Sequence, residues 1–216
     1  MTGWLSRYRP RGIVQSRGEG ELEFARVVAF SDGVIAIAIT LLVLTLDVPN
    51  VPNGDLAEAL GDQWRQYLAF GLSFALIGRF WIVHHRAFRL LGRFDGTLMV
   101  LNLIFLALIV VMPFATNLVA QYENDPVCIV VYASVVGLAS TMTWLMIRYS
   151  LASGHVRADM RPLAAAGSSW IALGPALVFL VSAPVALLSA GAAFALWLAA
   201  VLLSVLAAAI ASPEPG

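Results

Sequence analysis

The sequence predicts an all-α membrane protein with six transmembrane helices in each chain. Hydrophobic residues make up 60% of the 216 residues and charged residues only 12%, about half the charge of an average soluble domain. One soluble core could not bury so much apolar surface, so lipid must cover part of it. The apolar residues also form long uncharged stretches, and a membrane-spanning helix needs about 20 such residues.

Four stretches in the first two thirds of the chain have the length and composition of membrane spans. They are residues 27–46, 67 to about 91, 97–119 and 126–147. The first contains a single charge, Asp32, and the second is apolar at its start and basic at its end. The third and fourth carry no charge, so each of the four is expected to cross the bilayer once.

The last apolar stretch, residues 162–213, is too long for one crossing. It has 52 residues without a charge, and one helix of that length would measure about 78 Å against a hydrocarbon core of about 30 Å. We therefore expect a turn near residues 182–184 or 189–191, which gives a fifth and a sixth span. A re-entrant hairpin is the alternative for this stretch.

The distribution of arginines predicts the orientation in the membrane. Twelve of the thirteen arginines lie in the N-terminal segment or around the connections after the second and fourth helices, and only Arg65 lies on the other side. Because cytoplasmic loops are enriched in arginine, both termini are expected in the cytoplasm. Residues 1–23 would be a cytoplasmic tail, residues 24–211 the six-helix transmembrane domain and residues 212–216 a short cytoplasmic tail.

Composition and motifs exclude several classes of function. The net charge is zero, which gives no signal for nucleic acid, and the single cysteine, Cys128, has no disulfide partner within the chain. The chain contains neither H-E-x-x-H nor G-x-S-x-G, so we expect no enzyme. Two neighbouring histidines, His84 and His85, point about 100° apart on a helix and have no carboxylate at ligand spacing, so we expect no metal and no cofactor.

Ionisable or amide side chains inside the predicted spans include Asp32, Arg79, His84, His85 and Asn102. Polar and ionisable groups are costly in lipid, so they either satisfy one another between helices or mark an ion or proton pathway. The residues alone leave both interpretations open.

The first span has an aliphatic stripe when its residues are placed at about 100° intervals. With Ile37 as the reference direction, Leu41 falls at about +40° and Leu44 at about −20°. Thr40 falls at about −60°, whereas Asp32 lies almost opposite. One face is therefore aliphatic with a threonine, and the other carries the acid; ordinary packing or lipid contact would also produce such a stripe.

Three motifs in the first three spans match one known family. Residues 26–32 read R-x-x-x-F-S-D and lead directly into the aliphatic run of the first span, and residues 80–88 contain W-x-x-H-H-x-x-F. The third span carries Asn102 and the sequence Met-Pro-Phe at 112–114. The chain thus resembles the transmembrane-protein-175 family of endolysosomal potassium channels and its bacterial relatives. From the fourth span onward only length and hydrophobicity agree.

The resemblance implies a homotetramer in the inner (plasma) membrane of a bacterium, with a central pore lined by the first helix of each chain. It implies a hydrophobic constriction at Ile37, with Leu41 and Leu44 further out, and a contribution of Thr40 to potassium preference. It also implies a packing and hydrogen-bond network near the cytoplasmic end. That network would comprise Arg26, Phe30, Ser31, Asp32, Trp81, His84, His85 and Asn102.

On this basis we expect a passive, potassium-preferring cation channel with potassium as its permeant ion. Its partners would be copies of itself and the lipid bilayer. Asp47 would lie at the outer mouth and raise the local cation concentration, unless it is only a solvated helix end. Three alternatives remain: a proton-permeable channel or a proton-coupled secondary transporter that uses Asp32, His84 and His85, and a non-conducting membrane scaffold.

Overall fold

The computed structural model describes residues 17–52, 54–122, 125–168, 173–189, 191–193, 195–197 and 199, and these residues form helices joined by loops. The predicted ends of the tails, residues 1–16 and 212–216, lie outside the described residues, as does the end of the predicted sixth span. The elements are α1 Arg17–Leu41, η2 Leu42–Thr45, α2 Leu56–Asp62, α3 Trp64–Arg89, α4 Gly96–Gln121, α5 Pro126–Ala152, η3 Ala158–Met160, α6 Arg161–Ser168 and α7 Leu173–Ala186.

Within the residues that the structure describes, four helical segments are long and apolar enough to cross a membrane. They are Leu22–Thr45, which comprises most of α1 together with η2, and the helices α3, α4 and α5. The first four predicted spans are therefore confirmed. The helix of α1 begins at Arg17, inside the predicted tail, so its first turns precede the apolar part.

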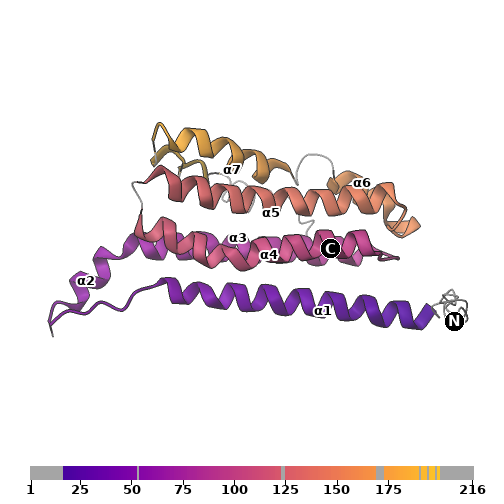
Figure 1. Cartoon of the computed structure of the whole chain (residues 1–216), viewed down its shortest axis with the longest axis horizontal. Coiled ribbons are helices and arrows are strands. Elements are labelled where there is room, and N and C mark those ends of the chain that lie inside the picture. The colour runs from indigo at the N-terminus through magenta and orange to yellow at the C-terminus, as the bar shows by residue number, and fades with distance from the viewer. Residues whose placement is uncertain are drawn as a thin grey trace, which may run out of the picture.

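The long helices run roughly side by side, and α1 lies at one edge of the bundle (Figure 1). Helices α3 and α4 follow α1, and α5 lies beyond them with α7 packed on its far side. Helix α1 packs on α3 and α4, whereas α5 packs mainly on α4 and α7. This order leaves one whole face of α1 without a neighbour in the described part of the chain.

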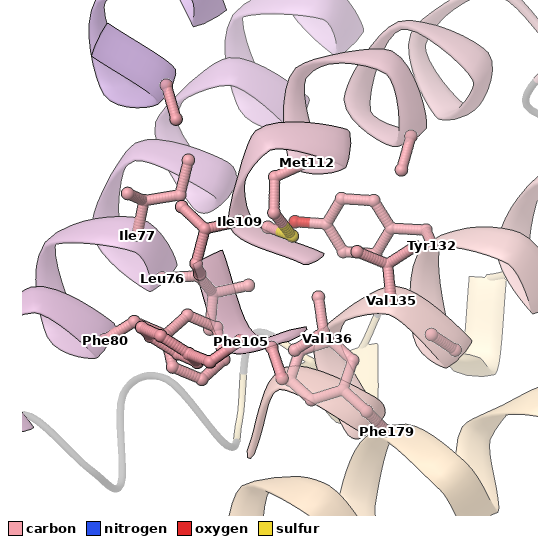
Figure 2. Packing of buried hydrophobic residues seen from close by; sticks show 14 of the residues in the cluster. Leu76, Ile77, Phe80, Phe105, Ile109, Met112, Tyr132, Val135, Val136 and Phe179 are labelled. Carbon is pink, nitrogen blue, oxygen red and sulfur yellow. The ribbon is translucent and has the colours of Figure 1, made fainter. Parts of the chain in front are cut away.

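A core of large side chains joins α3, α4, α5 and α7. Phe80 of α3 meets Phe105 of α4 edge to face, with ring centroids 5.9 Å apart, and Ile77 and Ile109 are fully buried beside them. Figure 2 shows these side chains continuing into a second group around Tyr132 of α5. Aromatic and branched side chains thus fill the interior of the subunit.

Polar residues define where α4 and α5 begin. The carboxylate of Asp95 accepts a hydrogen bond from the Leu98 N–H at 2.9 Å, and that of Asp125 accepts one from the Val127 N–H at 2.9 Å. Such N-caps satisfy backbone donors that have no partner inside the helix. Pro126 follows as the first residue of α5, where its missing N–H is not needed.

The structure places the turn in the C-terminal stretch at residues 187–189. Pro184 lies inside α7, so the first of the two predicted turn positions is wrong, and the turn lies next to the second. Trp197, beyond the turn, is fully buried and stacks on Phe179 of α7 with ring centroids 5.4 Å apart. The chain therefore folds back on α7, but the 14 residues of α7, about 21 Å of helix, are shorter than a full span. The six-helix count stays a prediction.

Candidate functional site

The outward face of α1 and η2 is apolar and uncovered, and this span has the smallest buried share, 22%, among the candidate spans of the described residues. On it, Ile37 is 62% exposed, Leu41 41% and Leu44 73%. Thr40 is exposed beside them. These are the residues that the helical wheel places on one stripe, and no described helix packs against them.

The hydroxyl of Thr40 is oriented by its own helix. It donates a hydrogen bond of 2.8 Å to the backbone carbonyl of Ile37. Because the hydroxyl has one hydrogen, this bond uses its donor and leaves the oxygen lone pairs available on the exposed face. The stripe therefore combines a row of aliphatic side chains with one oriented oxygen.

The opposite face of α1 is attached to α3 and α4 by a buried polar chain. The side-chain amide of Asn102 donates to the hydroxyl of Ser31 at 2.9 Å, and its oxygen lies 2.8 Å from Nε2 of His84. Ser31, Asn102 and His84 are each at most 1% exposed. Since this oxygen only accepts, Nε2 of His84 carries the proton. Three helices thus meet at one side-chain amide.

Asp32 makes a separate contact between α1 and α3. Its carboxylate accepts a hydrogen bond of 2.9 Å from the indole nitrogen of Trp81. The ring of Trp81 lies 5.7 Å from the ring of His85, centroid to centroid. Asp32 therefore faces α3 and lies away from the stripe.

Two residues of the signature motif lie outside these contacts. Arg26 is exposed, and its side chain has no hydrogen bond or ion pair with any residue that the structure describes. Phe30 is 55% exposed and lies on the outward side of α1. The structure thus connects Ser31, Asp32 and their partners, and it leaves Arg26 and Phe30 free to meet something outside the subunit.

The contacts of Asp32, His84 and His85 do not form a continuous proton path through the described residues. From His84 the hydrogen bonds lead through the amide of Asn102 to the hydroxyl of Ser31, which donates to the carbonyl of Val27 at 2.9 Å. A carboxamide does not readily accept and release protons, and the chain ends on a backbone carbonyl. The arrangement is suited to holding helices together.

Asp47 lies beyond the end of η2 and is exposed. The side chain of Gln66 in α3 binds it twice: the Asp47 N–H donates to Oε1 at 3.2 Å, and the Gln66 amide donates to the carboxylate at 3.1 Å. These bonds fix the end of the first span relative to the start of α3. The carboxylate remains in solvent.

Sequence reasoning missed a second buried polar cluster, which joins α3, α4 and α5. The hydroxyl of Thr116 lies 2.8 Å from the carbonyl of Met112 and 2.7 Å from Ser73 Oγ. Ser73 Oγ lies 2.8 Å from the hydroxyl of Tyr132. The carbonyl can only accept, so the three hydroxyls can each donate once along this chain. Single hydroxyls far apart in the sequence carry no local signal of such a pairing.

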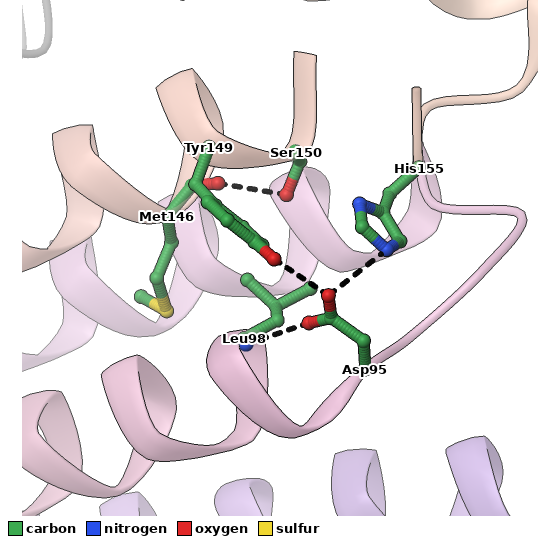
Figure 3. A network of polar contacts seen from close by, with 6 residues as sticks. All are labelled: Asp95, Leu98, Met146, Tyr149, Ser150 and His155. Carbon is green, nitrogen blue, oxygen red and sulfur yellow. Dashed lines mark hydrogen bonds and ion pairs between the residues drawn. The ribbon is translucent and has the colours of Figure 1, made fainter. Parts of the chain in front are cut away.

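A third polar group lies at the basic end of the bundle, where α4 begins (Figure 3). The carboxylate of Asp95 accepts a 2.6 Å bond from the Tyr149 hydroxyl and lies 3.4 Å from Nε2 of His155. The Tyr149 hydroxyl, followed by the Leu98 N–H and then by His155, holds the pKa of Asp95 below its usual range. This group fastens the α3–α4 connection to the end of α5.

The described residues bring no three histidine, cysteine or acidic side chains close enough to hold a metal ion. Cys128 is a buried thiol that can donate its one hydrogen to the backbone carbonyl of Tyr122 or of Asp125, both in the connection between α4 and α5.

Known proteins resemble this chain both in sequence and in fold. Residues 26–113 match the family described as "Endosomal/lysosomal potassium channel TMEM175". A potassium channel of Streptomyces collinus is 46% identical over 104 residues, which cover 48% of this chain and 50% of the relative. The endosomal/lysosomal proton channel TMEM175 of Gallus gallus is 34% identical over 155 residues, covering 66% of this chain and 30% of the relative.

A solved structure extends the likeness to nearly the whole fold. It is the crystal structure of a lysosomal potassium-selective channel TMEM175 homolog from Chamaesiphon minutus, with 31% identity and a TM-score of 0.77. The match covers 86% of this chain and 97% of that chain. In sequence, by contrast, this chain spans about half the length of the curated bacterial relatives it matches.

Proposed function

Since this chain belongs to the TMEM175 family, we propose that it is a passive, potassium-preferring cation channel in which the first helices of four identical subunits line a central pore. The family is one of ion channels and not of enzymes. The potassium preference, the tetramer and the pore-lining role of α1 are all parts of this proposal.

One observation carries the proposal: the outward face of α1 is aliphatic, bears one oriented hydroxyl, and is uncovered in the subunit. Ile37 at 62% and Leu44 at 73% exposure would otherwise be ordinary lipid contacts. The opposite face, however, is fixed to α3 and α4 through Ser31 and Asp32, so α1 presents this stripe in a defined direction. A symmetry axis running along the stripe would give each subunit the same place in a pore.

The mechanism of closure would be hydrophobic. Four Ile37 side chains that meet at the axis would make a narrow aliphatic ring, and such a ring empties of water and blocks ions without any plug. Opening would require the four helices to tilt or rotate until the ring widens and fills with water. Leu41 and Leu44 would continue the apolar lining.

Potassium preference would come from oxygen atoms near the ring. With its hydrogen donated to the Ile37 carbonyl, Thr40 would present lone pairs to a passing cation. Potassium is more weakly hydrated than sodium, so a few oxygens replace its water more readily. We expect weaker selectivity than that of a filter built from rings of carbonyls, because fewer oxygens surround the ion.

The decisive experiment is ion flux into liposomes that contain the purified chain. Vesicles loaded with potassium are diluted into sodium, and a dye reports the membrane potential; a potassium ionophore defines the upper limit. Ile37→Asn is expected to increase the flux several-fold, because an amide wets the constriction. The matched control is Ile104→Asn, the same change at a residue of α4 that is 44% exposed, which is expected to leave the flux unchanged.

Two outcomes would contradict the proposal. Equal effects of Ile37→Asn and Ile104→Asn would mean that the stripe is only a lipid contact. No flux from an intact oligomer in any arm would favour a transporter or a non-conducting scaffold.

Thr40→Ala tests selectivity separately: the potassium current is expected to persist while its ratio to the sodium current falls.

Proton permeation is the second candidate, because vertebrate relatives are named proton channels. An acid step without a potassium gradient tests it in the same liposomes. Since the described hydrogen bonds of His84 end at a backbone carbonyl, we expect His84→Gln to alter assembly more than proton flux. Loss of proton flux from a well-assembled variant would instead assign the histidine a role in conduction.

We further propose that the arginine-rich end of the bundle faces the cytoplasm of a bacterial cell, with the membrane being the inner one. The arginines of the α3–α4 and α5–α6 connections support this orientation. Labelling of a cysteine introduced at exposed Val48, between η2 and α2, tests it in intact cells. The reagent is expected to react from outside the cell.

A further inference from the structure

The arginine-rich end of the bundle contains a pocket that plays no part in the proposed pore. It has a volume of about 560 Å³ and is bounded by the ends of α3 and α5 and by η3 and α6. Three arginines line it, Arg86 and Arg89 from α3 and Arg157 from the loop before η3. Its remaining wall is apolar and includes Leu90 and Met160. The size is that of an ordinary small-ligand site.

Backbone contacts hold the walls of this pocket in place. Residues Leu91 and Val156 form an antiparallel bridge, in which the Gly92 N–H donates to the His155 carbonyl at 2.8 Å. The Arg157 N–H donates to the Leu90 carbonyl at 3.0 Å. These bonds join the α3–α4 connection to the connection after α5, and they place Arg157 next to the end of α3.

Close approach at Gly92 reinforces this placement. A Cβ atom on Gly92 would lie 2.9 Å from Cγ of Arg157, a distance that real Cβ atoms do not tolerate. The arginine stem therefore crosses the backbone where only glycine leaves room. Packing at Gly92 thus helps to position the stem of Arg157.

The positive charge of the pocket is almost uncompensated. Among the residues that the structure describes, no acidic residue lines the pocket, and none forms an ion pair with Arg86 or Arg89. Arg157 lies 4.0 Å from Asp159, but both side chains are substantially exposed, at 46% and 69%, so solvent weakens this pair. Guanidinium groups bind phosphate oxygens through paired hydrogen bonds, which makes a phosphate group the natural complement.

We propose that this pocket binds the headgroup of an anionic phospholipid from the membrane leaflet at the arginine-rich end of the bundle. The charge selects a phosphate-bearing headgroup, and the apolar wall next to it receives the start of the acyl chains. Basic pockets between membrane helices on the cytoplasmic side are suited to such lipids. Arginines that served only to orient the chain would need neither a shared hollow nor an apolar wall. The inference requires a membrane-embedded chain but does not depend on ion conduction.

The test is native mass spectrometry of the full chain in detergent, titrated with phosphatidylglycerol or with phosphatidylcholine. The wild type is expected to retain phosphatidylglycerol in preference to phosphatidylcholine. Replacing the three pocket arginines together (Arg86→Gln, Arg89→Gln, Arg157→Gln) is expected to weaken this binding on the order of a hundredfold, since each arginine near an anionic surface contributes to it.

The matched control removes three arginines that lie at the same end but outside the pocket. Arg93→Gln, Arg148→Gln and Arg161→Gln give the same change in net charge, and this triple variant is expected to retain the lipid. Ala87→Leu adds a test that keeps every charge, because Ala87 lines the pocket and a larger side chain there should weaken binding by occupying space.

Three results would overturn the proposal. Equal loss of lipid from both triple variants would mean that lipid binding depends only on the net charge of the protein. Equal retention of phosphatidylglycerol and phosphatidylcholine would mean that the pocket does not recognise the headgroup. Displacement of phosphatidylglycerol by an excess of inorganic phosphate would identify the pocket as a site for free anions. If the pocket triple variant does not fold, unchanged binding by a folded Ala87→Leu protein overturns the proposal by itself.

Discussion

Helices α1 and α5 are both long apolar helices, yet they occupy different environments. In the most apolar 18-residue stretch of α5, 56% of the residues are buried within the subunit, compared with 22% in the corresponding stretch of the first span. Helix α5 packs between α4 and α7, whereas α1 lies at the edge and is attached along one side only (Figure 1). Apolar composition shows that a helix belongs in the membrane, but it does not show whether its partners are protein or lipid.

The two helices are also attached by different interactions. Tyr132 of α5 forms a hydrogen bond to Ser73 and ring contacts with Phe179 and Trp197. The ring centroids of Tyr132 and Trp197 are 4.8 Å apart. The polar contacts of α1 depend instead on Ser31 and Asp32. A helix fixed by a few bonds on one side can change its tilt more readily than one packed on several sides. That difference is consistent with the proposed role of α1 as a pore helix that moves against the rest of the subunit.

The largest expected effect tests the packed side of this comparison. Tyr132→Ala removes a side chain that is 1% exposed; it leaves a cavity and takes from Ser73 one of its two hydrogen-bond partners. We expect a loss of about 3–5 kcal/mol in the free energy of unfolding. Unfolding followed by circular dichroism in detergent measures it.

Leu44→Ala is the matched truncation on the uncovered face. With Leu44 73% exposed, the expected change is below about 0.5 kcal/mol. Comparable losses at the two positions would mean that α1 is packed as extensively as α5, and the comparison would fail.

A smaller effect is expected where α1 is attached. Asn102→Leu keeps a similar volume but leaves Ser31 and His84 without their shared partner. We expect a loss of about 1–3 kcal/mol and faster hydrogen exchange in α1 than in α5. The control is Asn117→Leu, the same change on the same helix at a half-buried residue, and it should have little effect. Equal exchange in α1 for both variants would show that the amide does not hold the helix.

The smallest effect concerns pH. The folded state holds the pKa of Asp95 below its usual range, chiefly through Tyr149. The ionised carboxylate therefore stabilises the fold above the unfolded value of about 3.9, and this stabilisation is lost as pH falls through the lower, folded value. We expect the stability difference between wild type and Asp95→Asn to be constant near neutral pH and to shrink below about pH 4.

Tyr149→Phe sharpens the pH test. Without the phenol hydroxyl, the pKa of Asp95 should rise toward its usual value. The loss of stability in acid should then be smaller and should be complete at a higher pH. An acid profile that does not change in Tyr149→Phe would contradict the assignment of Tyr149 as the main cause.

Much of the candidate site was predictable because it lies on one helix. The angular relation of Ile37, Thr40, Leu41 and Asp32 depends only on helix geometry, and the structure shows the first three exposed and Asp32 facing α3. The contact between Ser31 and Asn102 joins residues 71 positions apart. Their pairing depends on how α1 docks on α4, which no local pattern contains.

The sequence by itself determined that this chain enters a membrane, where its first four spans lie and which face of the first span is aliphatic. Composition and helical periodicity are local properties, and they suffice for these conclusions. Only the tertiary structure decided which face of α1 stays uncovered, that Ser73, Thr116 and Tyr132 share one buried cluster, and that Arg86, Arg89 and Arg157 surround one pocket. Those features depend on distances between residues remote in the chain, and packing in three dimensions sets such distances.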